Sequence, residues 1–426
     1  MTTLVVFIVV LIAALLIGTP IAFGLILSGI AMMWWLGMLD WQLIALQMTN
    51  GADSFPLLAI PFFLLAGEAM NVGGLSRRLV NFGLTLVGHL KGGLGYVAIV
   101  TALLLASLSG SAIADTAVLA GMLIPIMRDA GYNLGRSAGL ISAGGIIAPV
   151  LPPSIGYIVF GVAGGVSITR LFMAGIVPGL LMALSLAVAW WLLSRKENTA
   201  VLPRSSWKDV GKAAMDAGFA FMLPVIIIGG LKAGIFTPTE AGVVACVYAL
   251  FIGCFVYREI SLAKLYHCFV SAVLTTSAVM LLVAAASITA YMIAIANIPA
   301  EIVGWLGPLR ESPLLLMAVM LLLLIVIGTA LDFIPTILIM TPVLLPIAKQ
   351  AGVDPVYFGV MFIMTAAISL ITPPVGAVLN VACAVAKVRY MDVVRGAIPF
   401  IVAQFAVLVL LWLFPQIVIV PARWLY

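Results

Sequence analysis

Ala148-Pro-Val-Leu-Pro-Pro-Ser154 places two consecutive prolines inside an apolar segment, and Ile371-Thr-Pro-Pro-Val-Gly376 does so a second time. A shift of 221 residues superposes both double prolines together with three flanking positions: Pro125 on Pro346, Gly131 on Gly352, and Pro178 on Pro399. Because proline removes a backbone donor and interrupts a helix, the repeated pattern predicts two homologous halves, each built around a broken helix. Duplicated chains with broken membrane helices are typical of transporters.

The composition of the chain is that of a membrane protein. Of its 426 residues, 65% are hydrophobic and only 8% are charged, and the mean hydropathy is +1.30. So few polar groups could not cover a water-soluble surface. Many apolar stretches approach or exceed the roughly 20 residues that cross a bilayer as a helix, so we expect an all-α polytopic bundle. The chain has room for about ten to twelve transmembrane helices plus re-entrant pieces.

Both ends of the chain follow this pattern. The segment from Leu4 to Leu36 has no basic leading region and no small-residue cleavage site. It therefore predicts two retained spans, broken at Gly18-Thr19-Pro20, rather than a signal peptide. The mixed segment from Trp41 to Asp53 fits a helix that lies along the membrane surface, and the last span is expected at roughly 398–420.

The charged residues bear on topology. The net charge of +5 arises from 20 basic and 15 acidic residues, and the basic ones lie in short loops, as in cytosolic loops of membrane proteins. This distribution does not imply a nucleic-acid partner. The most polar stretch, residues 195–213, joins the halves and is predicted to be cytosolic. Arg128 and its counterpart Lys349 are both basic, so loop charge leaves the relative orientation of the halves open; inversion is expected because duplicated transporters commonly use it.

A polar tip precedes each double proline. The segment from Gly92 to Met127 is too long for one span and is interrupted by Gly110 and Pro125, so it predicts a hairpin with Ser109-Gly-Ser111 at its tip. The second copy has Gly328-Thr-Ala-Leu-Asp332 at the corresponding place. Hydroxyl oxygens and unpaired backbone carbonyls are hard ligands that suit sodium, and in lipid such carbonyls need protein, an ion or water as partners. We therefore expect one cation site in each copy.

A structural explanation competes with this one. Serine and threonine in membrane helices can bond back to the preceding turn, and prolines can merely kink a helix. That explanation suffices for any one of these residues. It does not explain a polar tip and a double proline that occur twice at the same spacing, so the duplicated pair favours a site.

Acidic residues at membrane depth are costly and therefore functional candidates. Asp332 is the strongest, because it lies in the broken segment itself. Asp115 either caps a helix that begins at Thr116 or takes part in ion binding. Glu68 and Glu240 lie outside the repeated cores and are expected to make helix-to-helix or subunit contacts.

The remaining reactive residues indicate neither a metal site nor an enzyme. Arg170 and Arg389 lie near expected loops and fit topology anchors, while the positive ends of half-helices would favour an anionic substrate. His89 and His267 are isolated. The four cysteines have no metal-ligand spacing, and no phosphate-binding loop occurs, so no nucleotide is expected and an ion gradient is the expected energy source.

Taken together, these motifs resemble the large membrane subunit of the tripartite ATP-independent periplasmic (TRAP) transporter family, the DctM-like permeases. The resemblance runs essentially from end to end and rests on four segments: Ile60-Pro-Phe-Phe-Leu-Leu-Ala-Gly-Glu-Ala-Met-Asn-Val-Gly-Gly-Leu-Ser-Arg-Arg78, Ser109-Gly-Ser-Ala-Ile-Ala-Asp115, Ala148-Pro-Val-Leu-Pro-Pro-Ser154 and Thr372-Pro-Pro-Val-Gly-Ala-Val-Leu-Asn380.

The resemblance implies a fold of the ion-transporter superfamily, with two inverted repeats, two re-entrant hairpins and an elevator-like motion. It implies sodium as the coupling ion, uptake of an organic acid (a dicarboxylate, a sialic acid or a sugar acid), and a bacterial inner-membrane location. The implied partners are a separate small subunit of four spans and a periplasmic binding protein that delivers the substrate. The implied segments are 1–90 for N-terminal scaffold helices, 91–194 for the first transport repeat, 195–213 for the linker, 214–312 for a second scaffold part, and 313–426 for the second transport repeat with the C-terminal helix.

The same resemblance, carried over by position, implies two sodium sites and a substrate site between the hairpin tips. The first sodium site comprises Ser107, Ser109, Ser111, Gly144, Gly145 and Pro149. The second comprises Gly328, Thr329, Asp332, Thr372, Pro373 and Gly376. The substrate site includes Ser154 and Asn380.

Three other functions remain open at this point. A standalone sodium and organic anion symporter would share the repeats and ion sites but would need neither a binding protein nor a second subunit. A membrane scaffold would use the prolines only for packing and would have no reason to bind sodium. An intramembrane enzyme is disfavoured because the chain has no paired acids, zinc signature or serine elbow of recognisable spacing.

Overall fold

The computed structural model describes residues 2–195, 203–306 and 312–425, and within these ranges every regular element is a helix. The first half contains α1 (Thr2–Leu16), α2 (Ile21–Trp35), α3 (Trp41–Ala52), η1 (Phe55–Leu58), α4 (Ala59–Val72), α5 (Leu75–Val87), α6 (Gly93–Ser109), α7 (Ala112–Asp129), α8 (Leu134–Gly145), α9 (Ile155–Gly164) and α10 (Ile168–Ser194). The second half contains α11 (Trp207–Asp216), α12 (Gly218–Lys232), α13 (Pro238–Phe251), the π-helix η2 (Ile252–Val256), α14 (Leu262–Ile295), α15 (Ile298–Leu306), α16 (Pro313–Gly328), α17 (Phe333–Gln350), α18 (Pro355–Ser369), α19 (Ala377–Ala386), α20 (Tyr390–Leu413) and α21 (Gln416–Leu425). Part of the expected linker, residues 196–202, lies outside the described residues.

The helices are those of a polytopic membrane protein. In the described ranges, six helices are long and apolar enough to cross a bilayer, or seven if α11 and α12, which meet at 54°, form one span. Eight further apolar helices have only 10–17 residues. The all-helical, polytopic class is therefore confirmed. Single long helices do not reach the expected number of spans, because the breaks divide the chain into pairs of shorter helices.

The internal repeat is present in the structure. α7 and α17 both contain 18 residues and begin at Ala112 and Phe333, which are separated by the shift found in the sequence. α8 and α18 begin at equivalent positions as well, and the turns before them contain Gly131 and Gly352, both left-handed with φ of 78° and 76°. The peptide bond between the two prolines is cis in both copies. The duplication is therefore confirmed; the inverted orientation of the two copies stays a prediction.

The ends of the chain agree in part with expectation. The break at Gly18-Thr19-Pro20 separates α1 from α2, and α3 occupies the mixed segment after them, capped by Asp40. The last span was predicted at the wrong place: α20 begins at Tyr390, runs through Pro399 and ends at Leu413, and a separate α21 follows. The sequence misleads here because proline is tolerated inside a membrane helix when neighbouring groups compensate for the missing hydrogen bond.

The two copies interlock rather than forming separate lobes. α8 of the first copy packs along α20 of the second, and α9 packs against α17. The α8–α20 crossing is close: a Cβ at Gly139 would lie 2.6 Å from the Ala397 backbone nitrogen, and one at Gly396 would lie 2.3 Å from the Gly135 carbonyl oxygen. Only glycine fits at such a crossing. The breaks and tips of both copies are thereby brought to the same region of the molecule.

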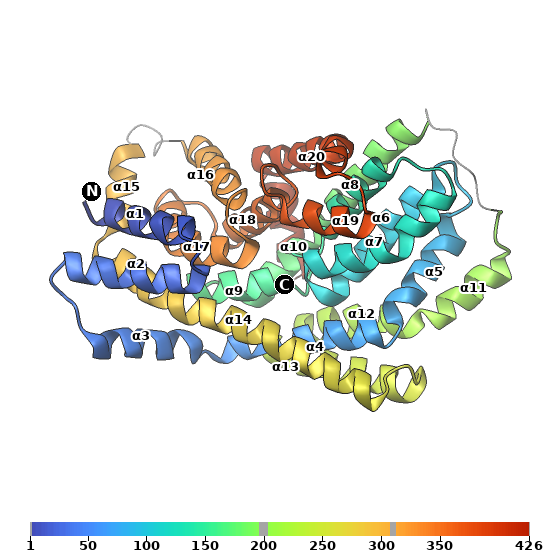
Figure 1. Ribbon diagram of the computed structural model, residues 1–426, viewed down its shortest axis with the longest axis horizontal. Coiled ribbons are helices and arrows are strands. Elements are labelled where there is room, and N and C mark those ends of the chain that lie inside the picture. The colour runs from blue at the N-terminus through green and yellow to red at the C-terminus, as the bar shows by residue number, and fades with distance from the viewer. Residues whose placement is uncertain (1, 196–202, 307–311, 426) are drawn as a thin grey trace.

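The remaining long helices surround this region on one side. Figure 1 shows α14 running diagonally across the molecule, with α2 and α3 along one part of it and α4 along another, and α13 packs against α4. Thr289 of α14 donates to the Leu25 carbonyl of α2 at 2.9 Å, and Ser271 donates to the Glu68 carboxylate of α4 at 2.8 Å. The prediction that Glu68 makes a helix-to-helix contact is confirmed.

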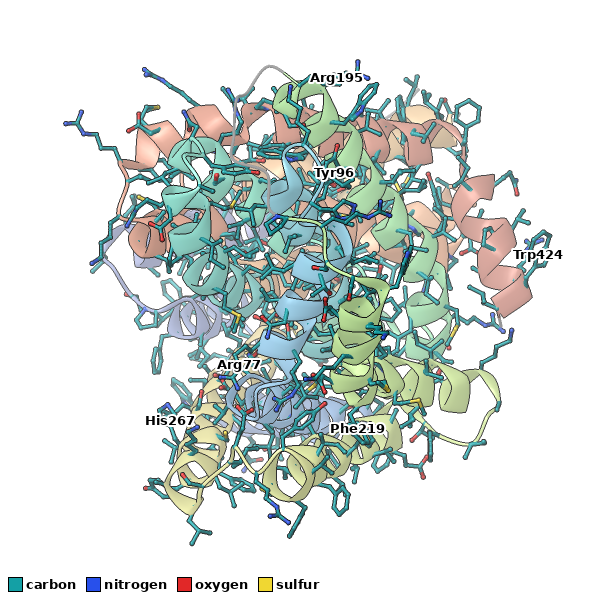
Figure 2. The ribbon with its side chains drawn as sticks, turned by 90° about the vertical axis from the view of Figure 1, so that its right-hand side faces the viewer. Arg77, Tyr96, Arg195, Phe219, His267 and Trp424 are labelled. Atoms are coloured by element: carbon teal, nitrogen blue, oxygen red, sulfur yellow. The ribbon has the colours of Figure 1, made fainter. Side chains whose placement is uncertain are left out.

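A charged cluster holds the far end of these helices together. Arg77 and Arg78 of α5 donate to the Glu259 carboxylate at 2.9 and 2.7 Å, and the Arg78 guanidinium lies 3.6 Å from the centre of the Tyr257 ring. The Tyr257 hydroxyl donates to the Asp216 carbonyl at the α11–α12 bend. Figure 2 shows Arg77 and Phe219 near this end, with Arg195 at the opposite edge of the view.

Candidate functional site

The tip of the first hairpin is organised by side chains of the tip itself. Gly110, left-handed with φ of 64°, joins α6 to α7. The Ser109 hydroxyl donates to the Asp115 carboxylate and accepts the Ser111 amide at 3.1 Å, while the Ser111 hydroxyl accepts the Ala114 amide at 3.4 Å. Ser111 is thus the N-cap of α7. The reading of Asp115 as the cap of a helix beginning at Thr116 is wrong, because α7 begins at Ala112 and Asp115 lies within its first turn.

The tip of the second hairpin also ends in a side chain that caps the following helix, but the capping group differs. Asp332 caps α17, and its carboxylate accepts the Phe333 amide at 2.8 Å. Ser111 and Asp332 therefore occupy the same position of the repeat, as their alignment under the shift predicted. The Thr329 hydroxyl, at the end of α16, donates to the Val326 carbonyl at 2.8 Å. A carboxylate thus replaces a hydroxyl in the second copy.

The first tip lies directly against the first break. A Cβ at Gly110 would lie 2.8 Å from the Pro153 carbonyl oxygen and 3.1 Å from the Ser154 Cα, so only a glycine allows this approach. A Cβ at Gly145 would lie 1.9 Å from the Thr116 hydroxyl oxygen and 3.0 Å from the Ala112 carbonyl oxygen. The structure therefore brings the serine-rich tip against the end of α8, and the assignment of a sodium ion to these residues stays a prediction.

Three other residues of the predicted sodium sites contact protein groups that the sequence did not indicate. Ser107 donates back to the Leu104 carbonyl of its own helix at 2.7 Å, which is the structural explanation considered above. Gly328 packs against Ser369 of α18, where a Cβ would lie 2.7 Å from the serine hydroxyl. The Thr372 hydroxyl donates to the Ile368 carbonyl at 2.9 Å.

The two breaks differ in exposure. Residues 145–154 are all buried, and the Ser154 hydroxyl donates to the Pro149 carbonyl at 2.6 Å. In the second copy Pro373, Pro374 and Val375 are exposed, and Asn380 donates through its amide nitrogen to the Val375 carbonyl at 2.9 Å. A side chain therefore donates to a backbone carbonyl in each break, but only the first break is buried as a whole.

A cavity of about 480 Å³ lies where the two hairpin tips meet. We call it the tip cavity. Its wall includes Ser111 and Pro149 from the first copy and Asp332 and Phe333 from the second. Pro20 of the α1–α2 turn and Val279 of α14 also line it. Space for a solute therefore exists between the tips, where the substrate site was predicted. Ser154 and Asn380 are not among its lining residues, and their assignment to the substrate stays a prediction.

Unpaired oxygens lie beside the first tip. The second carboxylate oxygen of Asp115 and the hydroxyl of Thr116 are buried and have no hydrogen-bond partner among the described residues. Unpaired buried oxygens are costly, and a cation can satisfy them. Sequence analysis considered Asp115 but missed Thr116, although its place directly after the Ser-Gly-Ser tip and Asp115 was a usable signal.

Glu240, the remaining acidic candidate, caps its own helix. The Glu240 carboxylate accepts from the amide and hydroxyl of Thr237, at 2.7 and 2.9 Å, in a capping box at the start of α13. The Glu240 side chain thus bonds at the start of its own helix rather than to a neighbouring helix, and a subunit contact of Glu240 stays a prediction. No group of three or more histidine, cysteine, aspartate or glutamate side chains could hold a metal ion within the ranges described above.

Comparison with known sequences gives one family. The family described as "Tripartite ATP-independent periplasmic transporter, DctM component" matches residues 8–417. The 2,3-diketo-L-gulonate TRAP transporter large permease protein of Escherichia coli is 50% identical over 415 residues, which cover 97% of this chain and 98% of the relative. The sialic acid TRAP transporter large permease protein of Vibrio cholerae is 38% identical over 399 residues, covering 94% and 93%.

Comparison with solved structures supports the fold alone. The crystal structure of the YdaH transporter of Alcanivorax borkumensis, described as having an unusual topology, superposes with a TM-score of 0.58 at 15% sequence identity. The match covers 88% of this chain and 87% of that one.

Proposed function

Because the chain belongs to the DctM component family of the tripartite ATP-independent periplasmic transporters, we propose that it is the large permease subunit through which an organic acid enters the cell. The observation that carries the proposal is the tip cavity, where the polar tips of two homologous hairpins meet. A transporter needs a solute site that two opposing parts of the molecule can both reach. A cavity lined by both copies and by the surrounding helices supplies one.

A sugar-derived carboxylic acid is the proposed substrate class. Relatives of this chain are named for 2,3-diketo-L-gulonate and for sialic acid, and the former is 50% identical over 97% of this chain. Both compounds are carboxylates that carry several oxygen substituents. A C4-dicarboxylate remains within the broader class of organic acids.

Sodium is the proposed coupling ion, at one site in each copy. The first site contains the predicted residues Ser107, Ser109, Ser111, Gly144, Gly145 and Pro149, and the second contains Gly328, Thr329, Asp332, Thr372, Pro373 and Gly376. The unpaired oxygens of Asp115 and Thr116 support the first site, because they lie in a buried position beside the tip. The exposed second break supports a site that solvent can reach.

The proposed assembly has three components. The chain is proposed to work in the bacterial inner membrane with a separate small subunit of four helices and with a periplasmic protein that binds the substrate and delivers it. The hairpins and broken helices would move as one transport unit relative to the long helices α4, α13 and α14, in an elevator-like step.

Reconstituted uptake tests the proposal. This chain is placed in proteoliposomes with and without the candidate small subunit and binding protein, and labelled diketogulonate, sialic acid and a C4-dicarboxylate are supplied under an inward sodium gradient. We expect uptake of one of them only when all three components and sodium are present. Uptake by this chain alone would identify a standalone symporter, and uptake without sodium would remove both proposed ion sites.

A further inference from the structure

The second break is held by two side chains that have no counterpart in the first copy. The Tyr390 hydroxyl lies 3.2 Å from the Pro374 carbonyl oxygen and 3.1 Å from the Val375 carbonyl oxygen, to which it can donate. Asn380 donates to the same Val375 carbonyl at 2.9 Å. Under the shift that relates the copies, these two positions correspond to Thr169 and Val159 in the first copy. We call Tyr390 and Asn380 the break clamp.

The clamp comes from both helices that follow the break. Asn380 lies in the first turn of α19, and Tyr390 is the first residue of α20. Gly376, the N-cap of α19, is left-handed with φ of 52°, and a Cβ there would lie 3.1 Å from the Tyr390 hydroxyl. The phenol therefore lies directly over the turn that leads from the double proline into α19. Rotation of either carbonyl would break its hydrogen bond to the clamp.

Exposure explains why this copy needs a clamp. The first break is buried on every side, so packing restricts the direction of its carbonyls, and the Ser154 hydroxyl, within the break itself, donates to the Pro149 carbonyl. The second break is exposed, and Val375 shows 47% of its surface. An exposed loop without packing samples several backbone conformations unless hydrogen bonds restrict it. A side-chain clamp restricts the backbone while leaving one face of the break open.

We propose that Tyr390 is a positioning residue, which directs the Pro374 and Val375 carbonyls and thereby sets the geometry of the Thr372–Gly376 part of the second cation site. This inference rests on the proposed function, because it assigns to Tyr390 a role in coupling-ion affinity. Tyr390 itself is not a ligand of the ion. Its hydroxyl acts through the backbone that it holds.

The test replaces only the hydroxyl. Tyr390→Phe keeps the ring and removes the single hydroxyl proton that faces both carbonyl oxygens. Tyr266→Phe is the matched control, because Tyr266 is 73% exposed and has no hydrogen bond in the described part of the chain. Each variant is reconstituted with the small subunit and the binding protein. Uptake is measured against sodium concentration at saturating solute, and against solute concentration at saturating sodium. Thermal melting of the purified complex is recorded in parallel.

We expect Tyr390→Phe to raise the half-saturating sodium concentration roughly 2- to 10-fold, the range that corresponds to the loss of one typical hydrogen bond. The maximal rate at saturating sodium and the half-saturating solute concentration should stay near those of the wild type, and Tyr266→Phe should change neither. A lower melting temperature with an unchanged sodium response would show that the phenol only supports the fold, and would overturn the proposal.

The design separates this inference from the function on which it depends. If the wild-type complex shows no sodium-dependent uptake, the proposed function fails, whatever the variant does. If the wild type responds to sodium and Tyr390→Phe responds identically, only the positioning role fails. Asn380→Leu, which removes the second half of the clamp, should shift the sodium response in the same direction; a shift in the solute response alone would overturn its membership of the clamp.

Discussion

Gly145 is the residue at which the first hairpin meets the end of α8. Its missing side chain leaves the space that the Thr116 hydroxyl occupies, 1.9 Å from where a Cβ would be. The nearby Asp115 side chain is only 2% exposed, and one of its carboxylate oxygens accepts a hydrogen bond from the Ser109 hydroxyl. The candidate site thus consists of the Thr116 and Asp115 oxygens beside Gly145. Substitutions of Gly145 and Asp115 test their roles.

Gly145→Ala should abolish or strongly reduce sodium-dependent uptake. The added methyl group would overlap the Thr116 hydroxyl and approach the Ala112 carbonyl oxygen to 3.0 Å, so α7 has to move away from α8. Overpacking of this kind costs about 1–3 kcal/mol, which should also lower the melting temperature. Gly121→Ala is the control, because a Cβ at that position of α7 has no neighbour within 4 Å. Normal uptake by Gly145→Ala would contradict the tight contact.

Asp115→Asn should weaken the response to sodium without destabilising the fold. The substitution keeps the shape of the side chain and removes a negative charge at a buried position, where an unpaired charge is costly. If the carboxylate contributes to the first cation site, the half-saturating sodium concentration should rise on the order of tenfold. Sodium titration of uptake and thermal melting measure the two effects. An unchanged sodium response would exclude Asp115 from the site.

At the scale of the helix, α7 and α17 are the same element used twice. Each has 18 residues, contains a proline in its last part, and begins at a capping residue that lines the tip cavity. The cap is Ser111 in one copy and Asp332 in the other. The helices thus share their geometry and differ in the charge that they present to the cavity.

Exchange of the caps tests this equivalence. Ser111→Ala and Asp332→Ala should each destabilise the protein by about 0.5–2 kcal/mol, because an N-terminal amide of the helix loses its side-chain partner. Ser111→Asp and Asp332→Ser should retain the melting temperature, because serine and aspartate are both good caps. Melting in detergent measures the difference. Equal destabilisation by alanine and by the exchanged residue would mean that the caps are not interchangeable.

At the scale of the whole molecule, the two copies are interlocked through α8–α20 and α9–α17. The glycines at the α8–α20 crossing allow backbones to approach more closely than other residues would. This arrangement places both tips beside one cavity, although the two copies are far apart in sequence. The relative orientation of the copies in the membrane is the feature that now needs a measurement.

Inverted copies would place equivalent residues on opposite sides of the membrane. Asp129 and Gln350 end α7 and α17, occupy equivalent positions and are both exposed. Each is replaced by cysteine in a background in which Cys246, Cys254, Cys268 and Cys383 are serine, and intact cells are treated with a membrane-impermeant thiol reagent. We expect only one of the two variants to be labelled. Equal labelling of both from outside would indicate parallel copies.

The repeat and the breaks could be predicted from the sequence, because proline and glycine act on the backbone locally. The same shift that aligns Pro125 with Pro346 also aligns the starts of α7 and α17 and the turns at Gly131 and Gly352. Local signals did not give the start of α20, because Pro399 is tolerated inside that helix. They also did not show that Ser111, rather than Asp115, is the N-cap of α7.

Only the tertiary structure decided which side chains meet across the site. The contact of Gly145 with Thr116, the approach of Gly110 to Pro153, and the bonds of Tyr390 to the second break all join residues separated by at least 15 positions in the chain. No local preference specifies such pairs, since they depend on how helices cross and on how closely their backbones approach. The amino-acid sequence by itself therefore determined a duplicated, proline-broken membrane bundle, and the packing of its helices determined the tip cavity and the oxygens around it.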